Sequence, residues 1–474
     1  MEIFRGGRSL MWLEIVLLLW FPYVYTVESQ IGFLSIDCGS DVSYTDNETG
    51  IFWHTDDGFI STGTNVKITD VHSDYGPLLD SGQVGTLRLF DDSNSLHCYS
   101  LPVISQETYL VRGTFFYGNL GTGSSPISFN ILMDNTYVYS IQFDEAILLS
   151  ETYDFEVIYS PTVNTLNVCL SREQGPSFIS ALELRQLANG MYADVVGSNQ
   201  YLYLYSRVNC GPPDAGPVTI WRYPDDPYDR VWSVAGSADN ATHMSNPNIS
   251  GSSNSFAQDP DRPPLVVMQT GWVYYESDIL WIEYSFTSPL GLAYTAAYFQ
   301  ELDGNASASN VRGMNYMLNG DFIESFNSSN QPKEVYAIHN ITDTVFNLSL
   351  VQTNWSHLQP ILNAYELYGV FEYGTSSRTA RQDVLAVYSL ANRFSLQYVD
   401  VQDPCFPNPL SWLSCSDDLP LRVIKLLLEN RGLAGNIPPE IFNLTALTYL
   451  DLNGNNLNGS IPVKLSGLAD LQTM

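Results

Sequence analysis

The chain has 474 residues, long enough for two to four domains that each bury a core. Its 51 acidic residues against 20 Lys and Arg give a formal charge of −31, which repels nucleic acid and anionic membrane faces and disfavours polyanionic ligands. Thirty Tyr and 22 Phe, with 25 Pro and 33 Gly, are typical of strands broken by many turns, so we expect a mainly β fold.

Residues 1–29 are predicted to be a secretory signal peptide. Arg5 and Arg8 precede the apolar stretch 10–25, which is the pattern of such a leader. Glu14 interrupts this stretch, so an uncleaved anchor is the alternative. No later segment approaches the ~20 apolar residues that a membrane helix needs. We therefore expect a mature chain that begins near residue 30 and lies outside the cytoplasm.

Potential N-glycosylation sites support a secretory route. Asn-x-Ser/Thr arises by chance, so one such site means little, but ten of them behind a leader are harder to dismiss. The predicted sites are Asn47, Asn240, Asn248, Asn305, Asn327, Asn340, Asn347, Asn354, Asn443 and Asn458.

The chain also repeats itself. Landmarks of its first part recur in the same order between 172 and 185 residues later, which is what loop insertions do to a duplicated domain. The matched pairs are Cys38 with Cys210, Tyr44 with Tyr223, Asp46 with Asp225, Trp53 with Trp232, Tyr109 with Tyr294, Phe129 with Met314, Leu166, Val168 and Leu170 with Phe346, Leu348 and Leu350, and Ala181–Glu183 with Ala364–Glu366. We predict two separate domains, 31–188 and 201–373.

Alternation within the matched segments predicts their fold. Leu166, Val168 and Leu170 share one face of a strand, and many such strands separated by Gly, Pro and Asn turns indicate antiparallel β-sandwiches of the jelly-roll type.

Residues 374–402 are predicted to form a linker with a possible short helix over 383–394. Its inward side chains would be Val384, Leu385 and Tyr388.

The tail, residues 403–474, has a period of 24. Leu426, Leu428, Leu433 and Gly435 recur as Leu450, Leu452, Leu457 and Gly459. This is the spacing of leucine-rich repeats, in which Asn455 hydrogen-bonds the backbone of a turn. We count two full repeats and a truncated third opened by Leu468 and Leu471, whose apolar end nothing in the chain covers.

These segments resemble a known family. Ile36-Asp-Cys-Gly39, the run Arg222–Trp232 and the Ala-x-Glu segments look like the malectin-like region of plant receptor-like kinases. Asp403-Pro-Cys405, Trp412 and Cys415, followed by leucine-rich repeats, resemble the juncture found in such receptors, although Gln402 stands where the family has Gly. The resemblance implies two tandem malectin-like jelly-roll sandwiches followed by the start of a leucine-rich repeat solenoid.

The run Tyr223–Trp232 has two interpretations. Its aromatic rings could stack on a sugar while Asp225, Asp226 and Asp229 accept hydrogen bonds from hydroxyls. Alternatively, Arg230 pairs with an aspartate and Trp232 fills the core. Because Tyr44, Asp46 and Trp53 repeat this pattern in the other copy, we favour the structural interpretation. Residues that bind a ligand remain unknown at this level.

The six cysteines suggest disulfides. Cys405 and Cys415 flank the repeats, so we expect a capping disulfide worth about 3 kcal/mol. Cys38 and Cys98 are a plausible second pair, whereas Cys169 and Cys210 would pair across the copies or remain buried thiols. No Cys-x-x-Cys or His-x-His spacing occurs, so we assign no metal site.

Catalytic signatures are absent from the sequence. It contains no Gly-x-Ser-x-Gly elbow, no His-Glu-x-x-His, no phosphate-binding loop and no kinase signature set. We assign no catalytic residue and no cofactor, and we expect no enzyme activity from this chain. A carbohydrate-active enzyme stays a weak alternative, since such enzymes need only two suitably spaced carboxylates.

The resemblance implies that the chain is the ligand-sensing ectodomain of a plant cell-surface receptor-like kinase. The sandwiches would bind a glycan or a secreted peptide, the repeats would face a ligand or co-receptor, and the membrane would be reached only through a missing C-terminal segment. On this view the chain is a truncated product of a longer receptor at the plasma membrane. A secreted lectin-like or decoy protein in the apoplast, without a signalling domain, is the alternative.

Overall fold

The computed structural model describes residues 30, 32–68, 83–92, 96–118, 127–134, 136–143, 152–196, 200–211, 220–234, 242–249, 261, 263–275, 277–286, 290–307, 309–329, 331–372, 379–394, 396, 404–405, 409–416, 421–460, 462 and 467–473. The predicted signal peptide, Asn240 and much of the predicted linker lie outside these residues. Among the described helices, none is long and apolar enough to cross a bilayer.

The described residues are mainly β-strands. The first copy contains β1 (Phe33–Asp37), β2 (Tyr44–Thr45), β3 (Phe52–Thr55), β4 (Thr64–Lys67), β5 (Thr86–Phe90), β6 (Leu96–Pro102), β7 (Tyr109–Phe115), β8 (Ile127–Met133), β9 (Thr136–Phe143), β10 (Tyr153–Tyr159), β11 (Thr165–Gln174), β12 (Ser177–Ile179) and β13 (Ala181–Gln186).

The second copy contains one short helix among its strands. These elements are β14 (Gln200–Asn209), β15 (Ile220–Trp221), β16 (Trp232–Val234), β17 (Thr242–Ser245), α1 (Leu265–Met268), β18 (Thr270–Val273), β19 (Ile279–Ser285), β20 (Gly291–Phe299), β21 (Gly313–Leu318), β22 (Asp321–Asn327), β23 (Lys333–Ile341), β24 (Val345–Gln352), β25 (Ile361–Leu362) and β26 (Ala364–Glu372).

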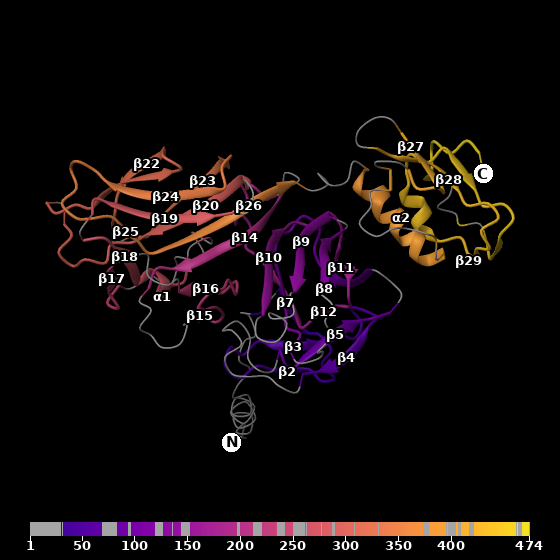
Figure 1. Ribbon diagram of the computed structural model, residues 1–474, viewed down its shortest axis with the longest axis horizontal. Coiled ribbons are helices and arrows are strands. Elements are labelled where there is room, and N and C mark those ends of the chain that lie inside the picture. Colours follow the sequence, from indigo (N-terminus) through magenta and orange to yellow (C-terminus); the bar gives the residue numbers. More distant parts are fainter. Residues whose placement is uncertain are drawn as a thin grey trace, which may run out of the picture.

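A single sheet runs through both copies, so the expectation of two separate sandwiches is wrong. Its strands follow the order β2-β3-β1-β13-β7-β10-β14-β26-β20-β23, with β15 and β16 attached to β14. The copies meet where β10 pairs antiparallel with β14, Val157 opposite Tyr203. Figure 1 shows the two copies side by side, joined through these strands. Backbone hydrogen bonds therefore connect the copies directly.

Each copy packs a smaller sheet against one face of the shared sheet. The order is β6-β11-β8-β9 over the first copy and β19-β24-β21-β22 over the second. The residues predicted to face inward on β11 and β24 are all buried between the sheets: Leu166, Val168, Leu170, Phe346, Leu348 and Leu350. On the opposite face, a third apolar cluster at the junction includes Leu110, Ile158, Leu202, Trp232 and Tyr294.

The duplicated landmarks agree with the strand registers at several positions. Ala181 lies opposite Asp37, and Ala364 lies opposite Asn209 in the second copy. The backbone N–H groups of Cys38 and Cys210 donate equivalent hydrogen bonds, to the carbonyls of Ser180 and Asn363. Strands β1, β3 and β13 of the first copy thus correspond to β14, β16 and β26.

Two of the matched pairs need correction. Tyr109 lies opposite Gln186, and its counterpart opposite Gly369 is Ala293, one residue before Tyr294. A slip of one residue turns a strand side chain to the other face, which periodicity within one strand does not reveal.

The match of Tyr44 with Tyr223 also fails. Tyr44 faces Trp53 across β2 and β3, whereas Trp221 faces Trp232 across β15 and β16. Tyr223 instead joins the apolar cluster of the first copy that contains Trp53, and its ring contacts Phe33. The two tryptophans therefore occupy equivalent strands with different neighbours.

The C-terminal part begins with α2 (Arg381–Phe394), whose described buried side chains include Ala386, Val387 and Leu390. The side chains of Val384, Leu385 and Tyr388, predicted to face inward, are outside the described set. The following elements are β27 (Leu413–Cys415), β28 (Val423–Leu427), β29 (Ala434–Asn436), η2 (Pro439–Asn443), β30 (Tyr449–Asp451) and β31 (Asn456–Asn458).

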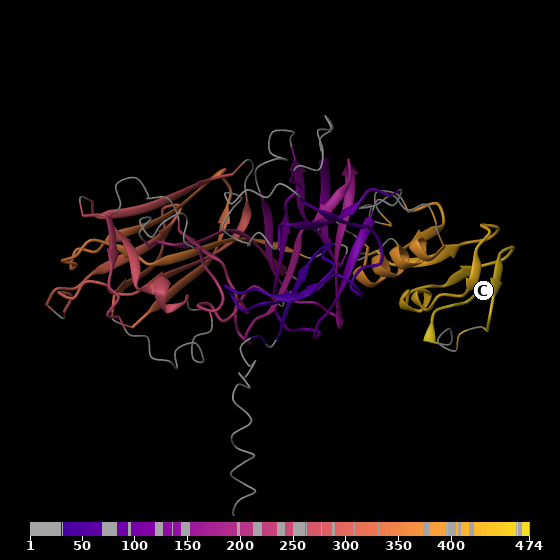
Figure 2. The ribbon, with the colours of Figure 1, turned by 90° about the horizontal axis from the view of Figure 1, so that it is seen from below.

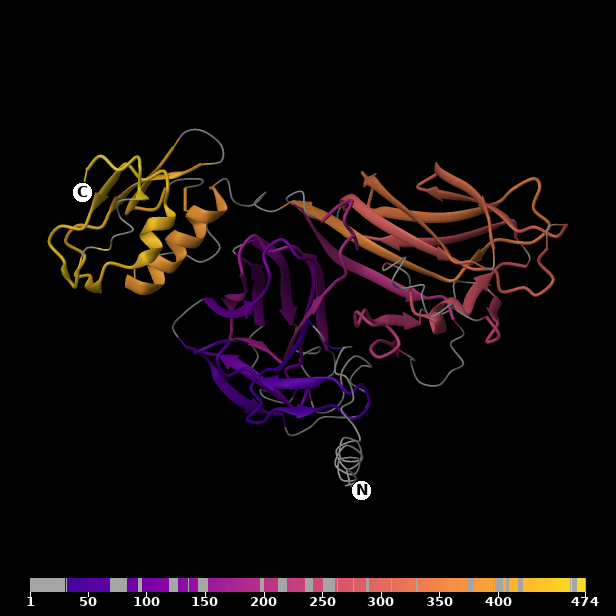
Figure 3. The ribbon, with the colours of Figure 1, turned by 180° about the vertical axis from the view of Figure 1, so that it is seen from behind.

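Stacked coils repeat through this part. Strands β28 and β30 pair in parallel with Leu426 beside Leu450, and Asn455 accepts backbone hydrogen bonds from Arg431 and Leu433. Leu468, expected to lie uncovered, is buried in the same apolar cluster because it packs on the preceding coil. Figures 2 and 3 place these coils beside the first copy, although they follow the second in sequence.

A buried network of charges holds the two copies together. Arg112 of β7 binds Glu156 of β10 at 2.7 Å, and Arg207 of β14 approaches the same carboxylate at 2.7 Å from the other copy. Arg207 also pairs with Glu366 of β26. All four side chains are at most 5% exposed. Charges buried to this degree are tolerated only when each has partners.

The loop after β15 completes the network. Its Asp229 accepts hydrogen bonds from Arg222 and from Arg185 of β13, at 2.8 Å each. Burial alone would raise the pKa of Asp229, but the guanidinium groups of Arg222 and Arg185 outweigh it and hold that pKa well below its usual value. A loop of the second copy is thereby anchored on the sheet of the first.

The buried carboxyl of Asp37 lies outside this network. Asp37, at the end of β1, accepts hydrogen bonds from Thr86 at 2.7 Å and from Tyr44 at 2.9 Å. Burial nevertheless raises the pKa of Asp37 to about 7, and the carboxylate of Asp56 adds to the effect. The second copy has Asn209 at the equivalent position, where Thr270 donates to its amide oxygen. A neutral side chain is thus accommodated at this place in the repeat.

We predict that Glu156→Ala destabilises both copies. The change leaves Arg112 and Arg207 without their shared buried partner, which should cost about 3–5 kcal/mol of unfolding free energy. Equilibrium denaturation of the variant should show one transition, with its midpoint at a lower denaturant concentration than in the wild type. Glu324→Ala is the control, because its ion pair with Lys333 is largely exposed and should contribute less than about 1 kcal/mol. A loss below 1 kcal/mol for Glu156→Ala would contradict the role given to the network.

We also predict that stability falls as the pH rises from about 4 to about 7. In this range Asp37 is ionised in the unfolded chain but keeps its proton in the folded one. The free energy of unfolding should therefore fall by up to about 1.4 kcal/mol per pH unit. Burial raises the pKa of Asp154 to about 6, so Asp154 acts in the same direction as Asp37. The paired carboxylates Glu156 and Asp229 have lowered pKa values and affect stability only below about pH 5. Melting curves of Asp37→Asn should have a flatter pH dependence than the wild type; equal slopes would contradict the prediction.

Candidate functional site

The run Tyr223–Trp232 is structural in this fold. Asp226 pairs with Arg230 at 2.9 Å and accepts the indole N–H of Trp232 at 2.8 Å, and all three side chains are fully buried. Asp229 is also fully buried. Asp226 and Asp229 thus have no surface to offer to a sugar, whereas Asp225 is exposed. The pairing of Arg230 with an aspartate and the burial of Trp232 agree with the structural interpretation.

A surface of aromatic side chains lies where the two copies meet. It consists of Tyr137 and Tyr139 on β9, Tyr203 and Tyr205 on β14, and Phe286 after β19, and we call it the tyrosine strip. Its rings form a chain: Tyr139 stacks on Tyr203 at 5.1 Å, Tyr203 contacts Tyr205 at 5.3 Å, and Tyr205 contacts Phe286 at 5.2 Å. The strip therefore joins the edge strands of both smaller sheets across the shared sheet.

Local backbone features hold the strip open to solvent. The register of β14 against β26 shifts between Leu204 and Ser206, and this irregularity places Tyr205 outward with 41% of its surface exposed. Gly369 on β26 makes room for it, because a Cβ there would lie 2.9 Å from a ring carbon of Tyr205.

Tyr137 is positioned by a hydrogen bond. The hydroxyl of Tyr201 donates to the Tyr137 carbonyl at 3.0 Å, and the Tyr137 side chain is 40% exposed. Tyr203, by contrast, is only 8% exposed and forms the floor of the strip. The strip thus combines a buried centre at Tyr203 with the exposed side chains of Tyr137 and Tyr205.

The chemistry of the strip is that of a recognition surface. Burial, aided by the neighbouring tyrosines, raises the pKa of Tyr203 and of Tyr205, so both hydroxyls remain protonated at neutral pH and can donate hydrogen bonds. Tyrosine offers a large rigid contact area at low entropic cost. Within the described residues, no cluster of three or more His, Cys, Asp or Glu side chains is arranged to hold a metal ion. The strip can bind a ligand by stacking and hydrogen bonding.

Sequence reasoning did not find the strip. The signal was the alternation Tyr201-Leu-Tyr-Leu-Tyr205, which puts three tyrosines on one face of a strand. The partners Tyr139 and Phe286 lie on other strands, however, so no local pattern connects them.

The predicted glycosylation sites that the structure describes are all accessible. Eight asparagines are exposed and Asn347 is partly exposed. Asn347 lies on β24 between buried Phe346 and Leu348, on the outer face as the alternation predicts. Only Asn47 of these sites lies in the first copy, whereas five of them occur between Asn305 and Asn354 in the second. Attached glycans would therefore cover mainly the second copy.

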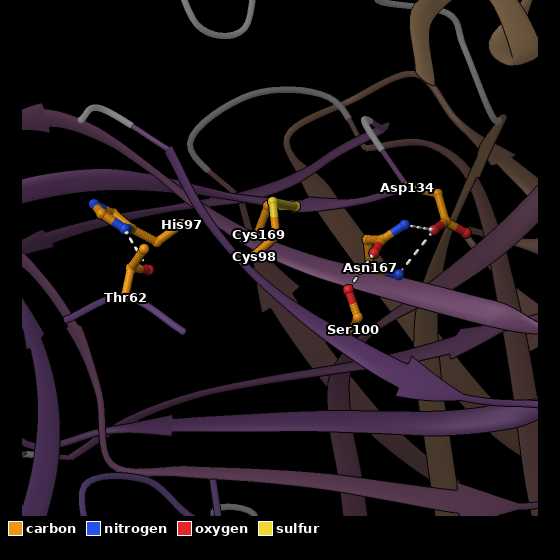
Figure 4. The surroundings of a disulfide bond; sticks show 7 residues. All are labelled: Thr62, His97, Cys98, Ser100, Asp134, Asn167 and Cys169. Atoms are coloured by element: carbon orange, nitrogen blue, oxygen red, sulfur yellow. Dashed lines mark hydrogen bonds between the residues drawn. A yellow bond between two sulfur atoms is a disulfide. The ribbon is translucent and has the colours of Figure 1, made fainter. Parts of the chain in front are cut away.

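The cysteines pair differently from the suggestion made for the first copy. Cys98 on β6 and Cys169 on β11 face each other across adjacent strands and form a disulfide, with their Cα atoms 4.0 Å apart. Figure 4 shows this disulfide between the Thr62–His97 contact and the Ser100–Asn167–Asp134 hydrogen bonds. The suggested partner of Cys98 was Cys38, which is instead a buried free thiol, as is Cys210.

The C-terminal part holds the second disulfide. Cys405 and Cys415 are joined there, with Cα atoms 5.8 Å apart. This pair stands at the start of the stacked coils, where the sequence placed it.

We predict that peptide mapping without reduction recovers the disulfides Cys98–Cys169 and Cys405–Cys415. Cys38 and Cys210 should react with an alkylating reagent only after denaturation, because both thiols are fully buried and their pKa values are raised by burial. Rapid alkylation of either thiol in the native protein, or a disulfide that includes Cys38, would contradict this assignment.

Comparisons with known proteins agree with this architecture. The family model described as malectin-like domain matches residues 36–370. The chain is 31% identical over 491 residues to a probable LRR receptor-like serine/threonine-protein kinase of Arabidopsis thaliana, covering 99% of this chain and 50% of that protein. A second Arabidopsis relative, PAM74, has a similar description and is 31% identical over 461 residues, covering 93% of this chain and 49% of PAM74. The chain thus spans about half the length of these relatives.

Solved structures share the fold at low sequence identity. The ANX1 ectodomain from Arabidopsis thaliana has a TM-score of 0.58 at 15% identity, covering 72% of this chain and 96% of the other. The complex of the plant peptide RALF23 with FER and LLG2 contains a match with a TM-score of 0.55 at 17% identity, covering 72% and 95%. Since the family model accounts for most of the chain, the chain belongs to the malectin-like domain family.

Proposed function

We propose that this chain is the extracellular ligand-sensing part of a plant receptor-like kinase and that the tyrosine strip receives the ligand. The observation that carries the proposal is the strip itself, since aromatic side chains from both copies form one accessible surface where the copies meet. The relatives, described as receptor-like kinases, support the receptor class. A kinase domain would lie outside this chain.

The strip favours a peptide ligand. It lies between β9 and β19, which are the edge strands of the two smaller sheets, and edge strands can pair with an extended peptide while aromatic side chains contact alternate residues. The charge of −31 favours a neutral or basic ligand over an acidic one. The structural neighbour described as a complex of the plant peptide RALF23 with FER and LLG2 supports a peptide ligand.

A neutral glycan is the second candidate. The exposed parts of the Tyr137 and Tyr205 side chains suit stacking against a sugar, and their hydroxyls can bind its hydroxyls. Both candidate ligands would therefore bind at the same surface, and the binding arrays described below distinguish between them.

We extend the proposal to the ends of the chain. Residues 1–29 would direct the protein into the secretory pathway and to the cell surface, where the predicted asparagines would carry glycans. Residues 31–188 and 201–373 would form the two malectin-like halves. The stacked coils of residues 403–474 would begin a leucine-rich repeat solenoid, whose parallel strands β28 and β30 would help form a concave face for a co-receptor.

We predict that Tyr137→Ala and Tyr205→Ala each weaken ligand binding at least about tenfold, which corresponds to about 1.4 kcal/mol. The wild-type ectodomain would be screened on peptide and neutral-glycan arrays, and its hits titrated against each variant. Phe322→Ala is the control, because Phe322 is 60% exposed on β22, outside the strip, and should leave affinity unchanged. Hits that bind both tyrosine variants with wild-type affinity would refute the site.

A further inference from the structure

A cavity of about 300 Å³ lies in the second copy, lined by residues of the loops around β21 and β22. At its floor Arg312 pairs with Glu301 at 3.0 Å, and Ser328 donates a hydrogen bond to the same carboxylate. The floor is thus electrically balanced. The rest of the lining is formed by small residues, of which Ser307, Asn310, Asn327 and Ser329 are polar and Ala306 and Val311 are apolar. Such a mixed lining suits a small, uncharged occupant that has both hydroxyl groups and apolar surface.

One lining residue is itself a predicted glycosylation site. Asn327 ends the edge strand β22, lies opposite Gly313 of β21 and begins the sequence Asn-Ser-Ser. Its side-chain oxygen accepts the indole N–H of Trp355 at 3.1 Å. An indole nitrogen can only donate, so this contact must be made by the amide oxygen. The amide nitrogen, the atom to which a glycan is attached, therefore faces away from Trp355.

The position of Trp355 is built into the fold. A Cβ on Gly313 would lie 2.7 Å from the indole nitrogen, so a glycine is needed for Trp355 to reach Asn327. The adjacent Ser356 side chain holds the loop by donating to the Leu358 carbonyl at 2.7 Å and accepting the backbone N–H of Gly313 at 2.9 Å. The amide of Asn327 is therefore oriented by a fixed partner rather than by chance.

We infer that the cavity holds the first N-acetylglucosamine of a glycan attached to Asn327. The linkage forms between the Asn327 amide nitrogen and the anomeric carbon of the sugar, while the bond from that carbon to the diphosphate of a lipid-linked oligosaccharide donor breaks and the amide proton is lost. A cavity of 300 Å³ is at the lower end of ligand pockets, which suits a single sugar ring. The inference requires secretion but is independent of the ligand proposed for the tyrosine strip.

Neighbouring sites favour an attached sugar over a free ligand. The backbone carbonyl of Asn305 accepts a hydrogen bond at 3.1 Å from the side chain of Asn310, which lines the cavity. Asn354 directly precedes Trp355 in the sequence. Glycans on these two asparagines would crowd the approach to the cavity. A freely diffusing ligand would have to pass between them, whereas the sugar on Asn327 is already in place.

Site-resolved enzymatic deglycosylation of the native protein tests the inference. The chain would be expressed in a secretory host and treated with peptide N-glycosidase in heavy-oxygen water, which marks each released asparagine for mass spectrometry. Release at Asn327 should be at least tenfold slower than at Asn340, which is exposed on β23. After denaturation the two rates should become equal. Equal rates in the native protein, or an unmodified Asn327, would overturn the inference.

Two variants separate the cavity from general accessibility. Trp355→Phe removes the N–H that orients the amide, and Ala306→Phe introduces bulk at the lining. Each should raise the release rate at Asn327 to within about twofold of that at Asn340, while the rate at Asn340 stays unchanged and reports an intact fold. Release at Asn327 that remains slow in both variants would contradict the assigned position of the sugar.

Discussion

The junction between the two copies depends on one buried carboxylate, Glu156, which is shared by guanidinium groups from both. Arg112 reaches it from the same copy and Arg207 from the other, each at 2.7 Å. Buried charges of this kind are costly unless every one is paired, so the network tolerates little displacement of one copy against the other. Together with the backbone pairing of β10 and β14, it makes the two sandwiches one body rather than two modules on a linker.

The paired junction has a consequence for recognition. The tyrosine strip is assembled from strands of both copies, so its ring spacing is set by the same junction that the charges hold. A surface fixed before the ligand arrives avoids part of the ordering cost of binding. Potential glycosylation sites are concentrated on the second copy, where the Asn327 cavity lies, and only Asn47 lies in the first copy. In the two proposals made above, sugar attachment and ligand binding therefore have separate places on the molecule.

Much of this organisation could be predicted from residues alone. Alternation identified the buried faces of β11 and β24, and the recurrence of Cys38 and Ala181 as Cys210 and Ala364 identified equivalent strands. Local patterns of this kind follow from strand geometry, in which successive side chains point to opposite faces of the sheet. The same reasoning missed the pairing of Cys98 with Cys169, because a disulfide requires two strands to be adjacent and in register.

The sequence by itself determined the mainly β character, the duplication, the periodic tail and the set of potential glycosylation sites, since each of these is a property of neighbouring residues or of a repeat. Only the tertiary structure decided that one sheet joins the copies, that Asp229 is enclosed by Arg185 and Arg222, and that Tyr139, Tyr205 and Phe286 share a surface. The physical reason is that these contacts join residues far apart in the chain. Their partners are chosen by register and by the need to neutralise every buried charge, and neither constraint is expressed in local sequence.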